Sequence, residues 1–235
     1  MPRRRFFLSL AAESGESVPG SRLVPDGRFA GYFLIRRLHS LTGVIPLGIF
    51  LVQHFYINSI SLQGEERYTG MATGLRGLPY LLAVEFFLIL LPLYFHGLLG
   101  LFLCWRGQAN VLRYPFARNW MYLFQRITGV VTIAFVTYHL LHTRFSGTEA
   151  EGLFQLMHRA LADPLVLGIY LVGVTASSYH LANGLWGFFI TWGIAQGRRV
   201  QAVASVAVHV LFVILVFFSV NALLGFSGRG LRLLH

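Results

Sequence analysis

The chain has 235 residues, of which 55% are hydrophobic and only 12% are charged. A soluble domain carries roughly 25% charged residues, so this composition excludes an ordinary soluble protein. The formal net charge is +10, but the arginines flank apolar runs and form no basic recognition face, which excludes nucleic-acid binding.

Five apolar runs are each long enough to cross about 30 Å of membrane hydrocarbon at about 1.5 Å per helical residue. They lie near 36–58, 79–105, 119–143, 164–195 and 202–225. We therefore expect an all-α membrane protein with five transmembrane helices, the first four of which form a bundle in the lipid. Residues 1–30 are expected to form a cytoplasmic arm, residues 31–226 the membrane domain, and residues 227–235 a short tail.

The placement of arginine predicts how the chain is oriented in the membrane. The second loop carries Arg106, Arg113 and Arg118 without an acid, and the fourth loop carries Arg198 and Arg199 without an acid. Loops rich in arginine stay on the cytoplasmic side. We therefore expect a multi-pass protein of the cytoplasmic membrane, with its N-terminus in the cytoplasm and its C-terminus outside.

Each of the first four apolar runs holds a histidine deep within it: His54, His96, His139 and His180. Because successive helices reverse direction, His54 and His139 fall near the outer face, whereas His96 and His180 fall nearer the cytoplasmic face. Ionisable side chains within a bilayer are costly and usually face a functional interior. The pattern predicts two histidine pairs at two depths, each joining two helices.

Imidazole binds iron, zinc and copper, and the number of ligands at each depth separates these metals. Zinc requires three or four clustered ligands. The single cysteine, Cys104, excludes a disulfide within the chain, a Cys-x-x-Cys-His haem attachment and a cysteine-ligated cluster. Two ligands from different helices suit the two axial positions of a haem iron. We interpret the two histidine pairs as the ligands of two haems.

Two internal similarities support this interpretation. His96 and His180 each begin the pattern His-x-x-x-Gly-Leu, which places Gly100 and Gly184 one turn beyond them on the same helix face. Glycine there lets a flat macrocycle lie against the backbone, or alternatively allows close helix packing. Similar stretches, "TGVIPLGIFLVQH" and "TGVVTIAFVTYH", end at the other two histidines, so the first four helices look like two copies of one hairpin.

His39 lies at the cytoplasmic end of the first run, beside Arg36 and Arg37, and the third run holds Gln125 and Arg126 at the corresponding place. All five are candidates for contact with haem propionates or with a quinone. The alternative for His39 is an ordinary residue of the membrane interface.

Glu85 is the only acid within an apolar run, and it lies near the outer end of the second helix. A carboxylate there can transfer the proton of a quinone reaction, or it can pair with an arginine at the membrane surface. His142 lies three residues beyond His139 and is a rival ligand. The remaining histidines, His158, His209 and His235, are assigned no function.

Four stretches closely resemble a known family: "RRLHSLTGVIPLGIFLVQH", "FHGLLG", "RNWMYLFQRITGVVTIAFVTYH" and "YHLANGLWGFFITWGI". The family is the dihaem cytochrome b membrane anchor of succinate:quinone oxidoreductases, in its single-chain, five-helix form, and the resemblance covers residues 33–225. It implies that the four paired histidines are haem ligands and that a flavoprotein and an iron–sulfur protein bind on the cytoplasmic side. Glu85 occupies an acidic position found on the second helix of Gram-positive-type succinate dehydrogenases.

The function implied is electron transfer between the iron–sulfur partner and a quinone, with menaquinone favoured, through two b haems. The chain would then be a subunit of succinate dehydrogenase or fumarate reductase, with the dicarboxylate chemistry on the flavoprotein. One alternative is the cytochrome b subunit of another quinone-linked enzyme, such as a hydrogenase or formate dehydrogenase. Another is a haem-free transporter, although transporters favour broken helices at a midplane site.

Overall fold

A computed structural model describes residues 27–229. The chain divides into two units, residues 1–36 and residues 37–235. Within the first unit, the described residues 27–36 form the beginning of helix α2 (Gly27–Val44). The expected arm over residues 1–30 lies almost entirely outside the described residues, as do residues 230–235 of the expected tail.

Five stretches of the described chain are long and apolar enough to cross a membrane, which confirms the number predicted from the sequence. They are Gly31–Gln63, Leu81–Arg106, Ala117–His142, Pro164–Thr191 and Arg198–Phe226. The first starts at Gly31 rather than at 36, and the fourth ends at Thr191 rather than at 195. All regular structure over residues 27–229 is helical, so the protein is an all-α, multi-pass membrane protein.

Prolines coincide with interruptions in the first two spans. In the first, α2 ends at Val44, and α3 (Pro46–Ser59) and the short helix η1 (Ile60–Gln63) follow. In the second, α5 (Leu81–Val84) leads into a π-helical segment, η2 (Glu85–Leu90), before α6 (Leu91–Arg106). Proline has no N–H to donate to the preceding turn, so Pro46 and Pro92 stand in the first turn of α3 and of α6.

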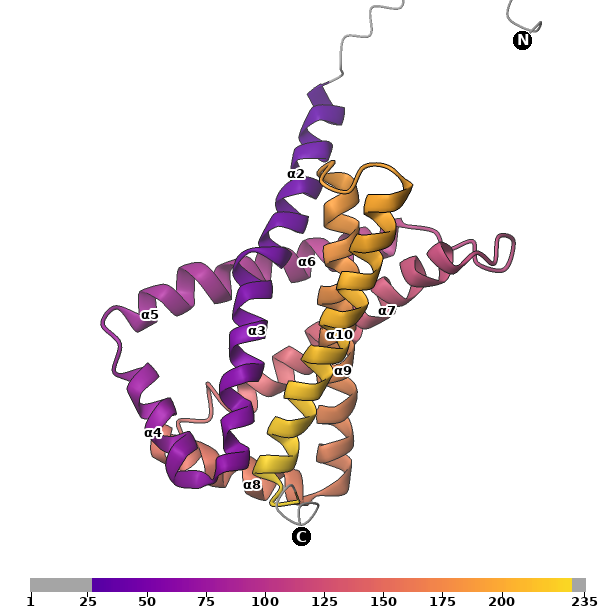
Figure 1. The fold of residues 1–235 in the computed structure, drawn as a ribbon. Helices are drawn as coiled ribbons and strands as arrows, with labels where there is room; N and C mark the ends of the chain where they lie inside the picture. Colours follow the sequence, from indigo (N-terminus) through magenta and orange to yellow (C-terminus); the bar gives the residue numbers. More distant parts are fainter. Residues whose placement is uncertain (1–26, 230–235) are drawn as a thin grey trace, which may run out of the picture. The chain divides into compact units, whose positions relative to one another are not determined.

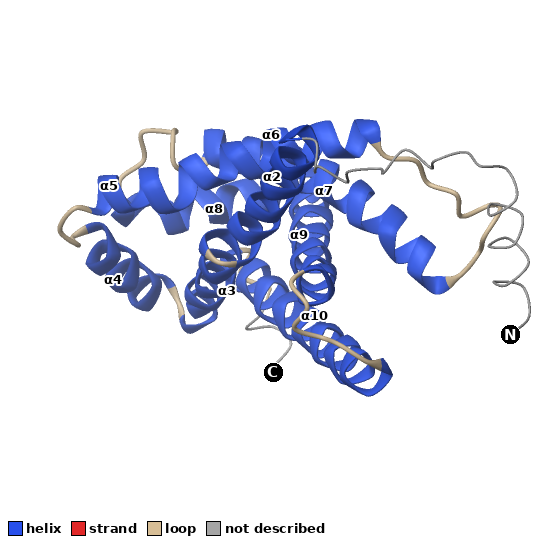
Figure 2. Ribbon diagram, turned by 90° about the horizontal axis from the view of Figure 1, so that it is seen from above, coloured by secondary structure: helices blue, strands red, loops and turns tan. Residues whose placement is uncertain are grey.

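The other three spans are single helices: α7 (Ala117–His142), α9 (Pro164–Thr191) and α10 (Arg198–Phe226). Within the second unit, α9 packs against α7 and α10, and α10 also packs against α3. The helices α6 and α7 cross this layer obliquely (Figures 1 and 2), and α6 contacts both α3 and α7. Residues far apart in the sequence therefore meet where the helices cross.

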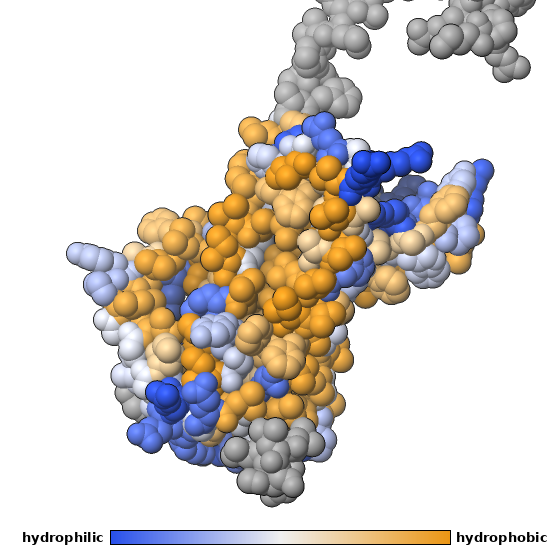
Figure 3. Space-filling model, viewed as in Figure 1, coloured by the Kyte–Doolittle hydropathy of each residue, from blue (hydrophilic) through white to orange (hydrophobic). Residues whose placement is uncertain are grey.

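Much of the molecular surface is apolar. On α10, the side chains of Val206, Val210, Val213 and Phe217 recur at helical spacing and are each more than half exposed. Figure 3 shows apolar surface extending along this part of the molecule. A soluble monomer rarely exposes a continuous apolar surface of this kind, whereas lipid hydrocarbon covers it in a membrane protein.

Two amphipathic loop helices were not predicted from the sequence: α4 (Glu65–Arg76) and α8 (Leu153–Ala162). They contribute to the hydrophobic core of the second unit, where Tyr68, Phe154 and Leu161 belong to one buried cluster with Phe226 at the end of α10. Both are shorter than a membrane span, so a search for membrane-length apolar runs passes over them.

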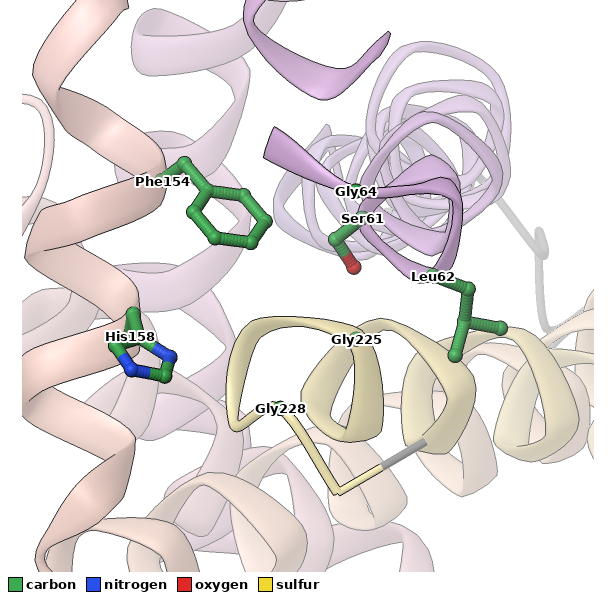
Figure 4. Close-up of a pocket in the computed structure, with 7 residues that line it drawn as sticks. All are labelled: Ser61, Leu62, Gly64, Phe154, His158, Gly225 and Gly228. Carbon is green, nitrogen blue, oxygen red and sulfur yellow. The ribbon is translucent and has the colours of Figure 1, made fainter. Parts of the chain in front are cut away.

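A small cavity of about 130 Å³ lies at this end of the second unit, as Figure 4 shows. Phe154 and His158 of α8 line one side, and Ser61 and Gly225 belong to the two chain segments opposite. The Nδ1 atom of His158 donates to the carbonyl oxygen of Phe226 at 2.6 Å. This histidine therefore ties α8 to the end of α10.

Candidate functional site

Crossing of the helices brings the four span histidines together in two pairs. The ring centroids of His54 on α3 and His139 on α7 are 5.8 Å apart, with an angle of 79° between the ring planes. The ring centroids of His96 on α6 and His180 on α9 are 6.1 Å apart, with an angle of 84°. The members of each pair are those that the depth argument from the sequence put together.

Hydrogen bonds to backbone carbonyl oxygens hold one ring nitrogen of two of these histidines. The Nδ1 atom of His96 donates to the backbone carbonyl oxygen of His39 at 2.8 Å. The Nδ1 atom of His180 donates to the backbone carbonyl oxygen of Gln125 at 3.0 Å. A ring nitrogen that donates to a carbonyl carries the proton, which leaves the lone pair on Nε2. Metal-binding histidines commonly use their second nitrogen in this way.

The separation within each pair fits two imidazoles that share one metal ion. A metal–nitrogen bond of about 2 Å on each side, with roughly 1 Å from each nitrogen to its ring centre, puts the two centroids about 6 Å apart. Among residues 27–229, no group of three or more His, Cys, Asp or Glu side chains is placed to hold a metal ion. Two nitrogen ligands per site suit the axial positions of a haem better than a zinc site.

His39 lies directly against the His96–His180 pair. Its ring stacks on that of His96, with centroids 4.1 Å apart and planes 8° apart. On the same stretch of α2, the guanidinium of Arg37 lies 4.8 Å from the ring centroid of Trp192. Trp192 also donates from Nε1 to Ser40 Oγ at 3.1 Å. Arg36 belongs to the first unit, where its guanidinium lies 5.7 Å from the ring centroid of Tyr32.

Gln125 and Arg126, adjacent in sequence, contact different helices. The side-chain amide of Gln125 donates to the carbonyl oxygen of His180 at 3.0 Å and accepts from Asn183 at 2.8 Å. The guanidinium of Arg126 donates to the carbonyl oxygens of Leu103, at 2.9 Å, and Cys104. These carbonyls lie in the last turn of α6, where a cation also favours the helix dipole. Arg126 therefore caps α6.

The glycines one turn beyond the second histidine pair face polar side chains. A Cβ atom at Gly100 would lie 3.1 Å from Nε2 of His39, and one at Gly184 would lie 3.1 Å from Nε2 of Gln125. The structure therefore places both glycines beside the polar side chains that flank the second histidine pair.

Glu85 is paired with an arginine. This is the alternative to proton transfer that the sequence left open for Glu85. Its Oε2 atom lies 2.8 Å from Nη2 and 3.2 Å from Nε of Arg144. Both side chains are partly exposed, with 25% of Glu85 and 39% of Arg144 accessible. Arg144 lies two residues beyond the end of α7 at His142, so the pair ties the start of η2 to the end of α7.

Tyr170 is a neighbour of the first pair that the sequence interpretation missed. Its hydroxyl oxygen lies 3.3 Å from Nδ1 of His139, and its side chain is buried. It stands near the start of α9, ten residues before His180, where its apolar neighbours gave no reason to single it out.

The other histidines make local contacts. The ring of the rival ligand His142 stacks on that of Tyr138, with centroids 5.8 Å apart. His209 donates from Nδ1 to the carbonyl oxygen of Ser205, one turn earlier on α10, at 2.5 Å. His235 lies outside the described residues.

Comparisons with known proteins identify related membrane subunits. Residues 108–219 match the family described as succinate dehydrogenase/fumarate reductase transmembrane subunit. The chain is also 39% identical over 195 residues to the succinate dehydrogenase cytochrome b558 subunit of Bacillus subtilis (strain 168). That match covers 83% of this chain and 96% of the relative.

Proposed function

Because the chain belongs to the family of succinate dehydrogenase cytochrome b558 subunits, we propose that it carries electrons between an iron–sulfur partner and a quinone through two haems. It is a membrane subunit of the succinate dehydrogenase enzyme complex. His54 and His139 bind one haem, and His96 and His180 bind the other. The observation that carries the proposal is the pair of two-imidazole sites with centroid separations near 6 Å.

Haem held by two histidines supplies reversible one-electron transfer without an open position for oxygen. The residues of this chain orient the imidazoles. The carbonyl oxygens of His39 and Gln125 hold the protons on Nδ1 of His96 and His180, so that Nε2 of each ring is the ligand atom. The Tyr170 hydroxyl has the corresponding position beside His139.

The partners are a flavoprotein, which interconverts succinate and fumarate, and the iron–sulfur protein. Their docking side is the one with acid-free arginine loops, which contain Arg113 and Arg198, and this side faces the cytoplasm. The chain then lies in the cytoplasmic membrane with its N-terminus inside and its C-terminus outside. Moving one charge across the membrane is linked to about 2.3 kcal/mol per 100 mV, which is enough to assist an unfavourable reduction of menaquinone.

Glu85 takes part in the proton transfer that accompanies quinone reduction. Its carboxylate is partly accessible and its partner Arg144 is nearer the surface. Arg144 donates to Oε2 of this carboxylate, and we infer that Oε1 is the oxygen that exchanges the proton.

The test of the haem assignment is a measurement of haem in the purified complex. A pyridine haemochrome assay is expected to give about two b haems per chain, because two bis-histidine sites are present. A reduced-minus-oxidised spectrum is expected to show two components. A fully loaded preparation with one haem, or with none, would show that the proposal is wrong.

A further inference from the structure

The first and third spans share a five-residue pattern at the points where they pass His96 and His180. It reads "HSLTG" over residues 39–43 and "QRITG" over residues 125–129. Each copy has a polar residue four positions before the glycine and a threonine directly before it. The threonine hydroxyls donate to backbone carbonyl oxygens one turn earlier, at 2.9 Å for Thr42 and 2.7 Å for Thr128. The two copies therefore have the same local geometry.

The first residue of each copy contacts a histidine through its backbone. The carbonyl oxygen of His39 accepts from Nδ1 of His96, and that of Gln125 accepts from Nδ1 of His180. Because the acceptor is a backbone atom, the same hydrogen bond forms whether the side chain is an imidazole or an amide. The carbonyl contact is therefore common to both copies, whereas the side-chain contacts differ: the Gln125 amide nitrogen also lies 3.2 Å from Nδ1 of His180, and the His39 ring stacks on His96.

The last residue of each copy makes room for the same ring. A methyl group on Gly43 would overlap the imidazole of His96, and one on Gly129 would lie 2.8 Å from Cε1 of His180. Real Cβ atoms essentially never approach this closely. Alanine is a better helix former than glycine, so helix stability alone would favour alanine at both positions. Each ring is held at Nδ1 by the carbonyl one turn away, which limits how far it can move aside.

We propose that the backbone of residues 39–43 and 125–129 positions His96 and His180, and that Gly43 and Gly129 are its essential members. In each copy the carbonyl fixes the tautomer of the ring and the glycine fixes where the ring lies. The inference rests on the proposed haem function and adds residues outside the ligand set. The His54–His139 pair does not use this device, since Nδ1 of His139 meets the hydroxyl of Tyr170.

The experiment replaces Gly43 and Gly129 with alanine, one at a time, in the assembled complex. Each variant is expected to perturb the His96–His180 haem and to leave the His54–His139 haem unchanged. The haem content is expected to fall from about two per chain towards about one. Where both haems are retained, the ferric EPR signal of the His96–His180 haem is expected to change. That signal depends on the angle between the imidazole planes, which is 84° here, and a general packing defect would not alter it selectively.

Two matched glycines serve as controls. Gly187 on α9 has no atom near the place of a Cβ, and Gly48 on α3 would bring a methyl group 2.9 Å from Cδ1 of Leu181, the flexible end of a side chain next to His180. Gly187→Ala and Gly48→Ala are both expected to keep two haems with unchanged spectra.

The outcomes separate this inference from the proposed function. If the unsubstituted complex lacks two haems, the proposed function is wrong. If it has two and both Gly43→Ala and Gly129→Ala retain unaltered spectra, the positioning inference alone is overturned. If the Gly43→Ala variant does not accumulate, the Gly129→Ala variant tests the inference, because its new methyl group overlaps the histidine ring less than the one at position 43. An equal loss in Gly48→Ala would assign the effect to packing and would also overturn the inference.

Discussion

The Nδ1 atom of His139 lies 3.3 Å from the hydroxyl oxygen of Tyr170, whereas Nδ1 of His96 and of His180 meets a backbone carbonyl. The Tyr170 side chain is buried, and its hydroxyl donates to the sulfur of Met157 at 3.8 Å. The phenol oxygen can therefore accept the proton of His139. Unlike a backbone carbonyl, this acceptor can be removed by a single conservative substitution.

Tyr170→Phe is expected to raise the midpoint potential of the His54–His139 haem without loss of haem. A hydrogen bond at Nδ1 makes a histidine ligand more basic and stabilises the oxidised metal, so removing the acceptor favours reduction. The measurement is an optical redox titration of the complex, with the His96–His180 haem as the internal reference. Tyr56→Phe, at an exposed position on α3, is the control and should change neither potential. An unchanged potential in Tyr170→Phe would contradict the role assigned to this hydroxyl.

Replacing single ligands is expected to remove one haem at a time. His54→Ala or His139→Ala should abolish one spectral component, and His96→Ala or His180→Ala the other, because the rings meet in these pairs. Loss of the same component in His54→Ala and His96→Ala would show that the pairing is wrong. His39→Ala should keep both haems, since the substitution leaves the carbonyl that accepts from His96 in place.

Glu85→Gln is expected to keep both haems and normal assembly but to slow quinone-dependent turnover strongly. The amide is nearly the same size as the carboxylate, yet it cannot carry the proton. Succinate oxidation with an artificial acceptor at the soluble subunits should be almost unchanged, because that route bypasses this chain. Arg144→Gln is the matched variant: it breaks the ion pair and leaves the carboxylate, so quinone turnover should persist. If Glu85→Gln keeps full quinone-linked activity across the pH range, another group transfers the proton to the quinone.

The packing of η1 against the end of α10 is expected to limit thermal stability. Ser61 Oγ donates to the carbonyl oxygen of Ala222 at 3.0 Å, and a Cβ on Gly225 would lie 2.6 Å from the carbonyl carbon of Ser61. Ser61→Ala should cost about 1 kcal/mol for a lost buried hydrogen bond, and Gly225→Ala should cost more because backbone must move. Thermal unfolding in detergent measures both. Gly70→Ala on α4, where a Cβ meets no atom, should not destabilise the protein and should instead add up to about 1 kcal/mol, because alanine is the better helix former.

The sequence by itself determined the five membrane spans and the partners within each histidine pair. A span needs only a long enough apolar run, which is a property of the chain read along its length. The pairing needs only the reversal of direction between successive helices, which brings residues of alternate helices to the same depth. Neither depends on how a helix is rotated about its own axis.

Only the tertiary structure decided which atoms meet. Glu85 pairs with Arg144, 59 positions away, and Arg126 donates to carbonyl oxygens in the last turn of α6. The sequence also gave no sign that His39 and Gln125 act through their carbonyl oxygens or that Tyr170 lies beside His139. These contacts depend on helix rotation, crossing and side-chain rotamers, which are set when whole faces pack together. Composition and spacing are therefore enough to predict the spans and the histidine pairs. The contacts between individual atoms are set only when the helices pack across one another.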